Sequence, residues 1–370
     1  MKKTLAIIII LAISLFPAIA FSQDGNSHEE IYIGNDTQLT QIIEDYAELL
    51  ETREKNIEKY ENMRLSRGGS YYYAKSLATK EKSILQVDYN IENKLDAIKT
   101  REAWLSIDFR TSFVNLYSAE ESMNNAIIAA YESKAEYASG QKNNEMGFIS
   151  NGDLLNLEYT AMASDNNALS KERRFESTLR EFNYKVGYPL SYDEYVYAFA
   201  EEILNTMELD FYILHALDNV PAVKTANQSL NKYYIDQKYF SQFSFSTGLT
   251  YIGEALRELD ITTRLQELSL EKVKKNLVNS ITDEYKALVI EREKINLAKL
   301  NVEVLQNEYE INSSLYNRGF IDKEELSESA KRLSEAEYGL IITIYKYNTQ
   351  VKSLEYKCAY YPEEGNDNEK

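Results

Sequence analysis

Histidine, cysteine, glycine and proline are all scarce in this chain of 370 residues. It has two histidines, His28 and His215, and a single cysteine, Cys358. A structural zinc site needs a set of Cys and His ligands, and a disulfide framework needs paired cysteines, so the composition excludes both. The sequence also has no glycine-rich phosphate loop, no metal-ligand cluster and no Ser/His/Asp arrangement. We therefore predict a protein that is not an enzyme and that holds no cofactor and no metal.

The shortage of glycine (13) and proline (4) also bears on the fold class. An α/β enzyme of this length would use both residues in its many strand–helix turns, so their scarcity favours few, long helices. The formal charge of −18 offers no basic face for nucleic acid, and we predict no nucleic-acid partner. The acidity is either an ordinary solvated surface or a wall that favours cationic solutes and basic adaptor proteins.

The first twenty residues have the pattern of a signal peptide. Lys2 and Lys3 precede an apolar run from Thr4 to Phe16, and Ala18-Ile19-Ala20 supplies a small-x-small cleavage site. The apolar run is short for a membrane span, although an uncleaved anchor is the alternative. We predict that residues 1–20 are removed and that the mature chain is exported without a helical anchor.

The mature chain contains an internal repeat. Gly147-Phe148-Ile149-Ser150 recurs as Gly319-Phe320-Ile321-Asp322, at an offset of 319 − 147 = 172 residues. The same offset pairs Phe113 with Tyr285 without any gap. Self-similarity at a fixed period is typical of repeated structural units. We assign residues 21–190 to the first copy, 191–360 to the second and 361–370 to a polar tail.

Each copy reads as two long helices around a short turn. Two apolar series of period seven run along the second copy: Ile281, Leu288, Ile295, Val302 and Tyr309, and Ile290, Leu297, Val304 and Ile311. The series lie two positions apart, or about 200° around a helix. Two seams on opposite flanks indicate a neighbour on each side, as for a stave in a barrel, and the strict period indicates supercoiling. A plain antiparallel coiled coil, with one seam per helix, is the alternative.

Helix and turn boundaries follow from local signals. The first copy predicts a helix from about Asp108 to Glu145, roughly 55 Å long. Gly147 and Gly319 suit the left-handed position just past a helix end. Ser150 and Asp153, like Asp322 and Glu325, have the spacing of a helix N-cap with an acid at its third position. Capping alone would therefore explain these acids.

Short stretches with apolar residues at every second position predict a small β-strand portion. One candidate runs from Phe243 to Tyr251, and another covers Ile261-x-Thr263-x-Leu265. In the first copy, the corresponding region begins at Gly68-Gly69-Ser70-Tyr71-Tyr72-Tyr73, with a further candidate at Leu85-x-Val87-x-Tyr89. A membrane strand needs about 9–11 residues, and only the segment 241–252 approaches that length.

These features together resemble the outer-membrane efflux family, the TolC-type channels of bacterial export systems. The signal peptide, the tandem hairpins and the two glycine-phenylalanine turns carry the resemblance. So does Ala216-Leu217-Asp218-Asn219-Val220-Pro221, which is similar to the A-L-x-N-N-P opening of the second half in that family. The resemblance covers residues 37 to 356.

The resemblance implies a homotrimer at the outer membrane and periplasm. Its long antiparallel hairpins would form a trimeric α-barrel, with a reduced β-barrel in contact with the membrane. It would be the passive exit duct of a tripartite efflux or type I secretion system, with a membrane-fusion adaptor and an inner-membrane pump as partners. An exported helical scaffold or surface interaction protein without a working pore is the alternative.

The same resemblance implies two sets of site residues. The turns that dock on the adaptor would be formed by Gly147, Phe148, Gly319 and Phe320. The constricted end of the pore would be lined by Asp153, Asn156, Glu325 and Glu328. Glu325 and Glu328 are three residues apart, so they share a helix face.

Overall fold

The computed structural model describes residues 32–186, 203–241 and 250–361, with the side chains of 250–252 left aside. The predicted signal peptide and polar tail lie outside these ranges. The described residues are mainly helical, as predicted. The helices are α3 (Thr37–Glu61), α4 (Ser70–Glu145), α5 (Asn151–Val186), α7 (Leu209–Asn219), α8 (Pro221–Phe240), α9 (Thr250–Asn317) and α10 (Lys323–Lys357).

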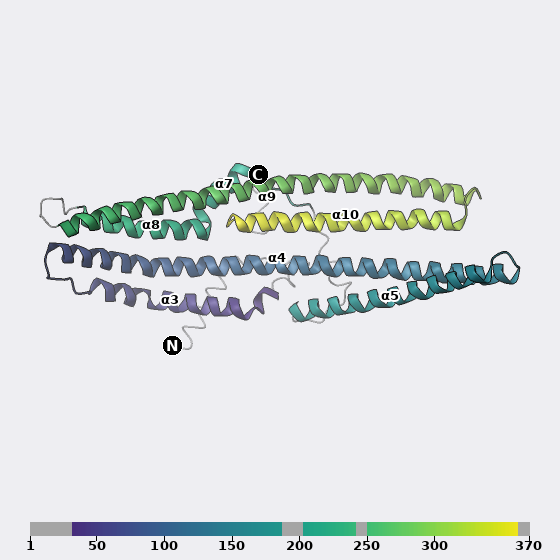
Figure 1. Ribbon diagram of the computed structural model, residues 1–370, viewed down its shortest axis with the longest axis horizontal. Coiled ribbons are helices and arrows are strands. Elements are labelled where there is room, and N and C mark those ends of the chain that lie inside the picture. Colours follow the sequence, from purple (N-terminus) through teal and green to yellow (C-terminus); the bar gives the residue numbers. More distant parts are fainter. Residues whose placement is uncertain (1–31, 187–202, 242–249, 362–370) are drawn as a thin grey trace.

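Two helices, α4 and α9, run the full length of the elongated molecule (Figure 1). Each is accompanied by two shorter helices placed end to end, α3 and α5 along α4, and α8 and α10 along α9. Both α8 and α10 also contact α4, so they lie between the two long helices. The helices therefore form a layer in which α9 is one edge, and α3 and α5 are the other.

The long helix of the first copy begins much earlier than the sequence pattern predicted. It starts at Ser70 rather than near Asp108 and contains 76 residues, which corresponds to about 114 Å. The sequence has neither glycine nor proline between Gly69 and Gly140, so nothing interrupts the backbone hydrogen bonds over this distance. None of the helices in the described ranges has the length and apolar character needed to cross a membrane.

The predicted strands at 85–89 and 261–265 are wrong, because both segments are helical. The region after Gly68 is also helical from Ser70 onward, and the described residues contain no strand. A helix with neighbours on two flanks is apolar at positions two apart, which imitates the alternation of a strand. Residues 243–249 of the remaining candidate lie outside the described ranges, and Tyr251 belongs to α9.

Two clusters of buried side chains hold the layer together. In the first, Phe109 and Phe113 of α4 meet Phe182 of α5 and Tyr345 of α10. The rings of Phe109 and Phe182 lie 5.4 Å apart between centroids, and those of Phe113 and Tyr345 lie 5.5 Å apart. In the second cluster, the series Ile281, Leu288 and Ile295 of α9 is buried against Tyr347, Val351 and Leu354 of α10. One of the two predicted seams of α9 is therefore the hairpin core.

Small residues bring α4 and α5 close together near their turn. Ala126 and Ala130 of α4 pack on Ala168 of α5. Nearer the turn, a Cβ atom added to Gly140 would lie 2.4 Å from the Leu157 side chain. The Leu157 side chain fills the space beside Gly140, so a side chain at this position would require Leu157 to move.

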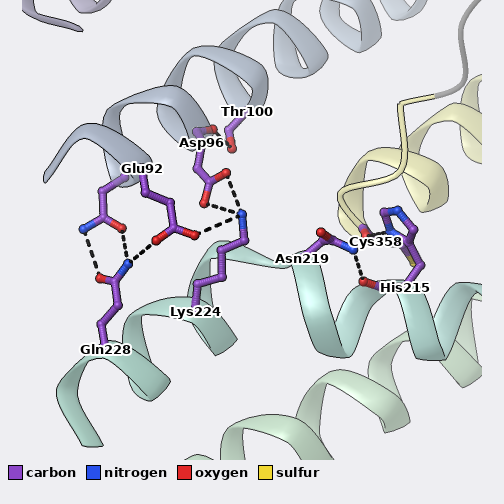
Figure 2. A network of polar contacts seen from close by, with 9 residues as sticks. Glu92, Asp96, Thr100, His215, Asn219, Lys224, Gln228 and Cys358 are labelled. Carbon is purple, nitrogen blue, oxygen red and sulfur yellow. Dashed lines mark hydrogen bonds and ion pairs between the residues drawn. The ribbon is translucent and has the colours of Figure 1, made fainter. Parts of the chain in front are cut away.

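A polar network joins the two halves of the chain near the middle of the molecule (Figure 2). Nζ of Lys224 on α8 lies 3.0 Å from Asp96 on α4, and 3.7 Å from Glu92. Gln228, one turn further along α8, donates to Glu92 at 3.0 Å. The Asp96 and Gln228 residues are 9% and 7% exposed, so these contacts are sheltered from water.

The Ala216–Pro221 motif is the bend that brings α8 into this position. Pro221 opens α8, where its missing N–H is not needed, and Val220 is extended. The Asn219 side chain donates to the carbonyl of His215, while Nδ1 of His215 lies 3.0 Å from the carbonyl of Cys358 (Figure 2). Cys358 itself is fully buried, and burial raises the pKa of its thiol to about 12.

Replacement of Lys224 tests the contribution of this network. We expect Lys224→Met to lower the free energy of unfolding by about 2–3 kcal/mol, because Asp96 keeps a sheltered charge without its partner. The double variant Lys224→Met/Asp96→Leu should recover most of that loss in thermal unfolding. The exposed pair Lys134–Asp165 provides the control, since Lys134→Met should cost less than about 1 kcal/mol. Equal losses in both single variants would contradict the assignment.

Candidate functional site

The two turns at the end of the hairpins have the same backbone geometry. Gly147 and Gly319 have φ angles of 76° and 78°, so the predicted left-handed conformation is confirmed. In the first turn, the N–H of Phe148 donates to the carbonyl of Asn143 and that of Gly147 to Asn144. In the second, Phe320 donates to Leu315 and Gly319 to Tyr316. This Schellman pattern closes both helices and reverses the chain within a few residues.

Each turn presents a phenylalanine to solvent. Phe148 and Phe320 are each 74% exposed. Apart from the adjacent residues, no atom of the described chain lies within 4 Å of the position where a Cβ of either turn glycine would stand. Among the described residues, nothing covers the outer faces of the two turn glycines. A large apolar ring so placed is a suitable contact for another protein.

The acid after the first turn caps a helix, as its spacing predicted. The Asp153 carboxylate accepts hydrogen bonds from the Ser150 hydroxyl at 2.7 Å and from the Ser150 N–H at 3.1 Å. The N–H of Asp153 donates in return to the Ser150 hydroxyl. These hydrogen bonds hold the pKa of Asp153 below its usual range. The carboxylate is therefore charged and fixed at the start of α5.

In the second turn, Asp322 caps the helix and Glu325 stands at the position equivalent to Asp153. Asp322 is the cap and accepts from the N–H of Glu325 at 2.9 Å, which leaves the Glu325 side chain exposed at the start of α10. Glu328 follows on the same face, with its side chain 56% exposed. Asn156 is the equivalent of Glu328 on α5 and is also exposed. Both turns lie at one end of the molecule, so the four predicted pore residues are brought to that end (Figure 1).

A basic residue near this site was missed by the sequence analysis. Nε of Arg332 lies 4.0 Å from the Glu328 carboxylate, one helical turn away, and its guanidinium also binds Glu308 of α9 at 2.8 Å. The spacing of four residues between Glu328 and Arg332 is the signal that could have revealed it. Glu328 is therefore a weakly paired acid, whereas no partner contacts the Glu325 carboxylate in the described part of the chain.

Two helices at the edges of the layer, α9 and α5, carry exposed apolar stripes. On α9 the stripe is the second predicted series, with exposed fractions of 55–66%: Ile290, Leu297, Val304 and Ile311. On α5 a matching stripe repeats every seven residues at Leu155, Met162 and Leu169, which are 48–64% exposed. The α5 stripe was readable from its period and was overlooked. Together the stripes mark both edges of the layer as uncovered.

Comparison with solved structures identifies the fold. No protein-family model and no curated protein sequence matches the chain. The structure is similar to that of the outer-membrane channel OprN, with 11% identity, a TM-score of 0.59 and coverage of 91% of this chain and 90% of that one. It is also similar to the CmeC outer membrane channel of Campylobacter jejuni, with 11% identity, a TM-score of 0.56 and coverage of 90% and 85%.

The MtrE outer membrane channel of Neisseria gonorrhoeae is similar to the same degree. It shares 10% identity and a TM-score of 0.57, over 90% of this chain and 88% of the channel. The resemblance inferred from the turns and the heptads is thus confirmed at the level of the fold, over nearly the whole length of these channels.

Proposed function

We propose that this protein is the exit duct of a bacterial export system, exported to the periplasm and outer membrane. In this proposal three copies form a hollow α-barrel that docks on a periplasmic adaptor and serves an inner-membrane pump. The observation that carries it is the pair of exposed heptad stripes at the two edges of one layer of helices. The fold shared with outer-membrane channels supports the same function.

The edge stripes suit a ring of identical subunits. The α9 stripe and the α5 stripe both follow a period of seven and lie on opposite edges of the same layer. Placing α5 of one copy against α9 of the next would bury both, by the knobs-into-holes packing that such a period permits. Because the two edges differ, the contact is head to tail, and a head-to-tail contact that closes makes a ring. We take the number of three from the resemblance.

Replacement of one seam residue tests the ring. We expect Leu297→Glu to convert the trimer into monomers at micromolar concentration, since the contact would bury a carboxylate without a partner. The mass in mild detergent, measured by light scattering after gel filtration, reports the change. Lys299→Glu, a larger change of charge at an exposed position off the seam, should leave the trimer intact. A trimeric Leu297→Glu variant, or a monomeric wild type, would refute the proposed ring.

The turn residues are the proposed contact with the adaptor. Gly147 and Gly319 supply the backbone shape, and Phe148 and Phe320 supply the apolar contact. A β-branched residue at either glycine would strain the left-handed backbone, so its effects on folding and docking could not be separated. The phenylalanines are the better test, because their side chains are largely exposed in the protomer and neither residue has a positive φ.

We expect Phe148→Ser/Phe320→Ser to abolish export while leaving the fold unchanged. The free energy of unfolding should change by no more than about 0.5 kcal/mol, as for other exposed sites. Retention of a cationic dye by cells that contain only this variant should rise to the level of cells without the protein. Tyr184→Ser removes an aromatic ring that is 89% exposed on α5, away from the turns, and serves as the control. Normal dye export by the double variant would exclude docking through these rings.

The acids beyond the turns are the proposed lining of the narrow end. Three copies of Glu325 and Glu328 would form rings of carboxylates, which favour cations and repel anions. Asp153 and Asn156 occupy the equivalent positions of the first copy. The hydrogen bonds of Asp153 to Ser150 make its capping role the larger one for stability.

Conductance and stability measurements separate these roles. We expect Glu325→Gln/Glu328→Gln to lose most of the cation selectivity of the purified channel in a planar bilayer, with unchanged thermal unfolding. Asp153→Asn should behave differently, since loss of the carboxylate weakens the capping box at the start of α5 and lowers the thermal stability, while most of the ring charge remains. Unchanged selectivity in the double variant would show that these glutamates do not line the pore.

A further inference from the structure

The short segment after α10, residues 358–361, connects the two halves of the chain. Helix α10 ends near the middle of the molecule, where α4 and α7 lie on either side of its last turn (Figure 1). The N–H of Tyr360 donates to the carbonyl of Glu355. The N–H of Ala359 donates to the carbonyl of Tyr356. This is the Schellman pattern of the two hairpin turns, but here it leads two consecutive tyrosines to different helices.

The backbone of this segment is held in a strained conformation. Ala359 has a φ angle of 54° and is the one non-glycine residue with a positive φ among the described residues. Gly147 and Gly319 occupy the equivalent position of the hairpin turns. A side chain makes this conformation costly, so it persists where the surrounding contacts impose it. The contacts of the two tyrosines that follow are therefore what fixes the segment.

The two tyrosines bind opposite sides of the joint. The ring of Tyr360 lies 5.1 Å from that of Phe211 and 5.4 Å from that of His215, both on α7. Tyr361 lies on α4 instead, where Nζ of Lys99 is 5.8 Å from the centre of its ring. Burial raises the pKa of Tyr361 to about 12, so its hydroxyl group is neutral under ordinary conditions.

The carboxyl group of Glu102 lies on α4 near Tyr361 and acts on the pKa of its hydroxyl group. Glu102 is partly buried, and neither a hydrogen bond nor an ion pair reaches its carboxyl group in the described part of the chain. Burial raises the pKa of Glu102 from its usual 4.5 to about 7, while Lys99 acts in the opposite direction. Glu102 therefore changes its charge close to neutral pH, beside the residue that ties the segment to α4.

The other charged groups around this joint are already paired. Asp96 binds Lys224 of α8 at 3.0 Å. Arg101 binds Asp36, the residue before α3, at 2.6 Å. From α10, the neutral hydroxyl group of Tyr356 bonds to α4 at Ser106. The other titratable group in contact with the segment is His215, which faces Tyr360 from α7.

We propose that residues 358–361 and Glu102 form a pH-sensitive latch between the end of α10 and α4. A protonated Glu102 stays in its partly buried place beneath the closed latch. An ionised Glu102 requires water, which it gains when Tyr361 leaves α4. The latch lies within one protomer, so it stands or fails separately from the proposed ring and duct.

The direction of the pH dependence follows from the proton that the closed latch holds more tightly. The open state releases this proton near pH 4.5 and the closed state near pH 7. The latch is therefore most stable below this range, loses stability as the pH rises through it, and changes no further once both states are ionised. The second hairpin is thus held more firmly to α4 in acid than in neutral medium.

Hydrogen exchange of the mature chain, followed by mass spectrometry, tests the latch. The amides of residues 358–360 are bonded to the last turn of α10 and exchange when the latch opens. We expect their protection factors to fall about 10-fold or more between about pH 5.5 and about pH 8. A peptide from the middle of α9 should keep its protection, which excludes general unfolding. Glu102→Gln should show at both pH values the protection of the wild type in acid.

Further variants separate the latch from its surroundings. Glu136→Gln makes the same change at an exposed position of α4 and should keep the pH dependence of the wild type. Tyr361→Phe keeps the ring and should also keep it, whereas Tyr361→Ala should lose both the protection and its pH dependence. His215→Gln should lower the protection equally at both pH values, because His215 contacts Tyr360 from α7 rather than from α4.

Three results overturn the proposal. The first is a wild type whose segment 358–361 is equally protected at both pH values. The second is a Glu102→Gln variant that retains the pH dependence of the wild type. The third is loss of that dependence in His215→Gln, because the histidine would then be the group that responds to pH.

Discussion

The architecture depends on one constraint. Each long helix has apolar side chains on more than one flank, and each of these flanks has to be covered by a neighbouring helix. A helix of 76 residues packed against one partner would leave its other apolar stripe in water over tens of ångströms. In α4 the requirement is met within the protomer, because α3 and α5 cover one flank and α8 and α10 cover the other. In the described part of the chain, α9 is covered by α8 and α10 and, over a shorter stretch, by α7, while its stripe from Ile290 to Ile311 stays exposed. At the α9 edge of the layer, the protomer therefore leaves apolar side chains exposed to solvent.

The parts of the fold that were predictable from the sequence are those set by neighbours along the chain. The turn glycines, the caps at Ser150 and Asp322 and the buried series from Ile281 to Ile295 all depend on spacings of three to seven residues. The strand predictions failed for the same reason that the seam prediction succeeded. Apolar positions two apart, such as Leu85 and Val87, belong to a helix with neighbours on both sides rather than to a strand.

Contacts between residues far apart in the sequence could not be predicted from local patterns. Lys224 and Asp96 meet across 128 residues, and neither residue belongs to a pattern that would pair them. The site shows the same division. Sequence spacing placed Asp153 and Glu325 at helix starts, but only the structure separates a carboxylate held by Ser150 from one that is exposed. Whether an exposed acid faces the axis of a ring depends on how subunits meet, which no local spacing encodes.

Because Cys358 is buried, its reaction with a thiol reagent can report local opening at the C-terminal end of α10. The thiol is the only one in the sequence, it is fully enclosed, and its raised pKa keeps it protonated at neutral pH. A thiol reagent can therefore react only when the residues around it separate, among them Tyr212 and Ala216 of α7. The rate of labelling therefore reports how often the C-terminal end of α10 separates from α7, which is a local unfolding event.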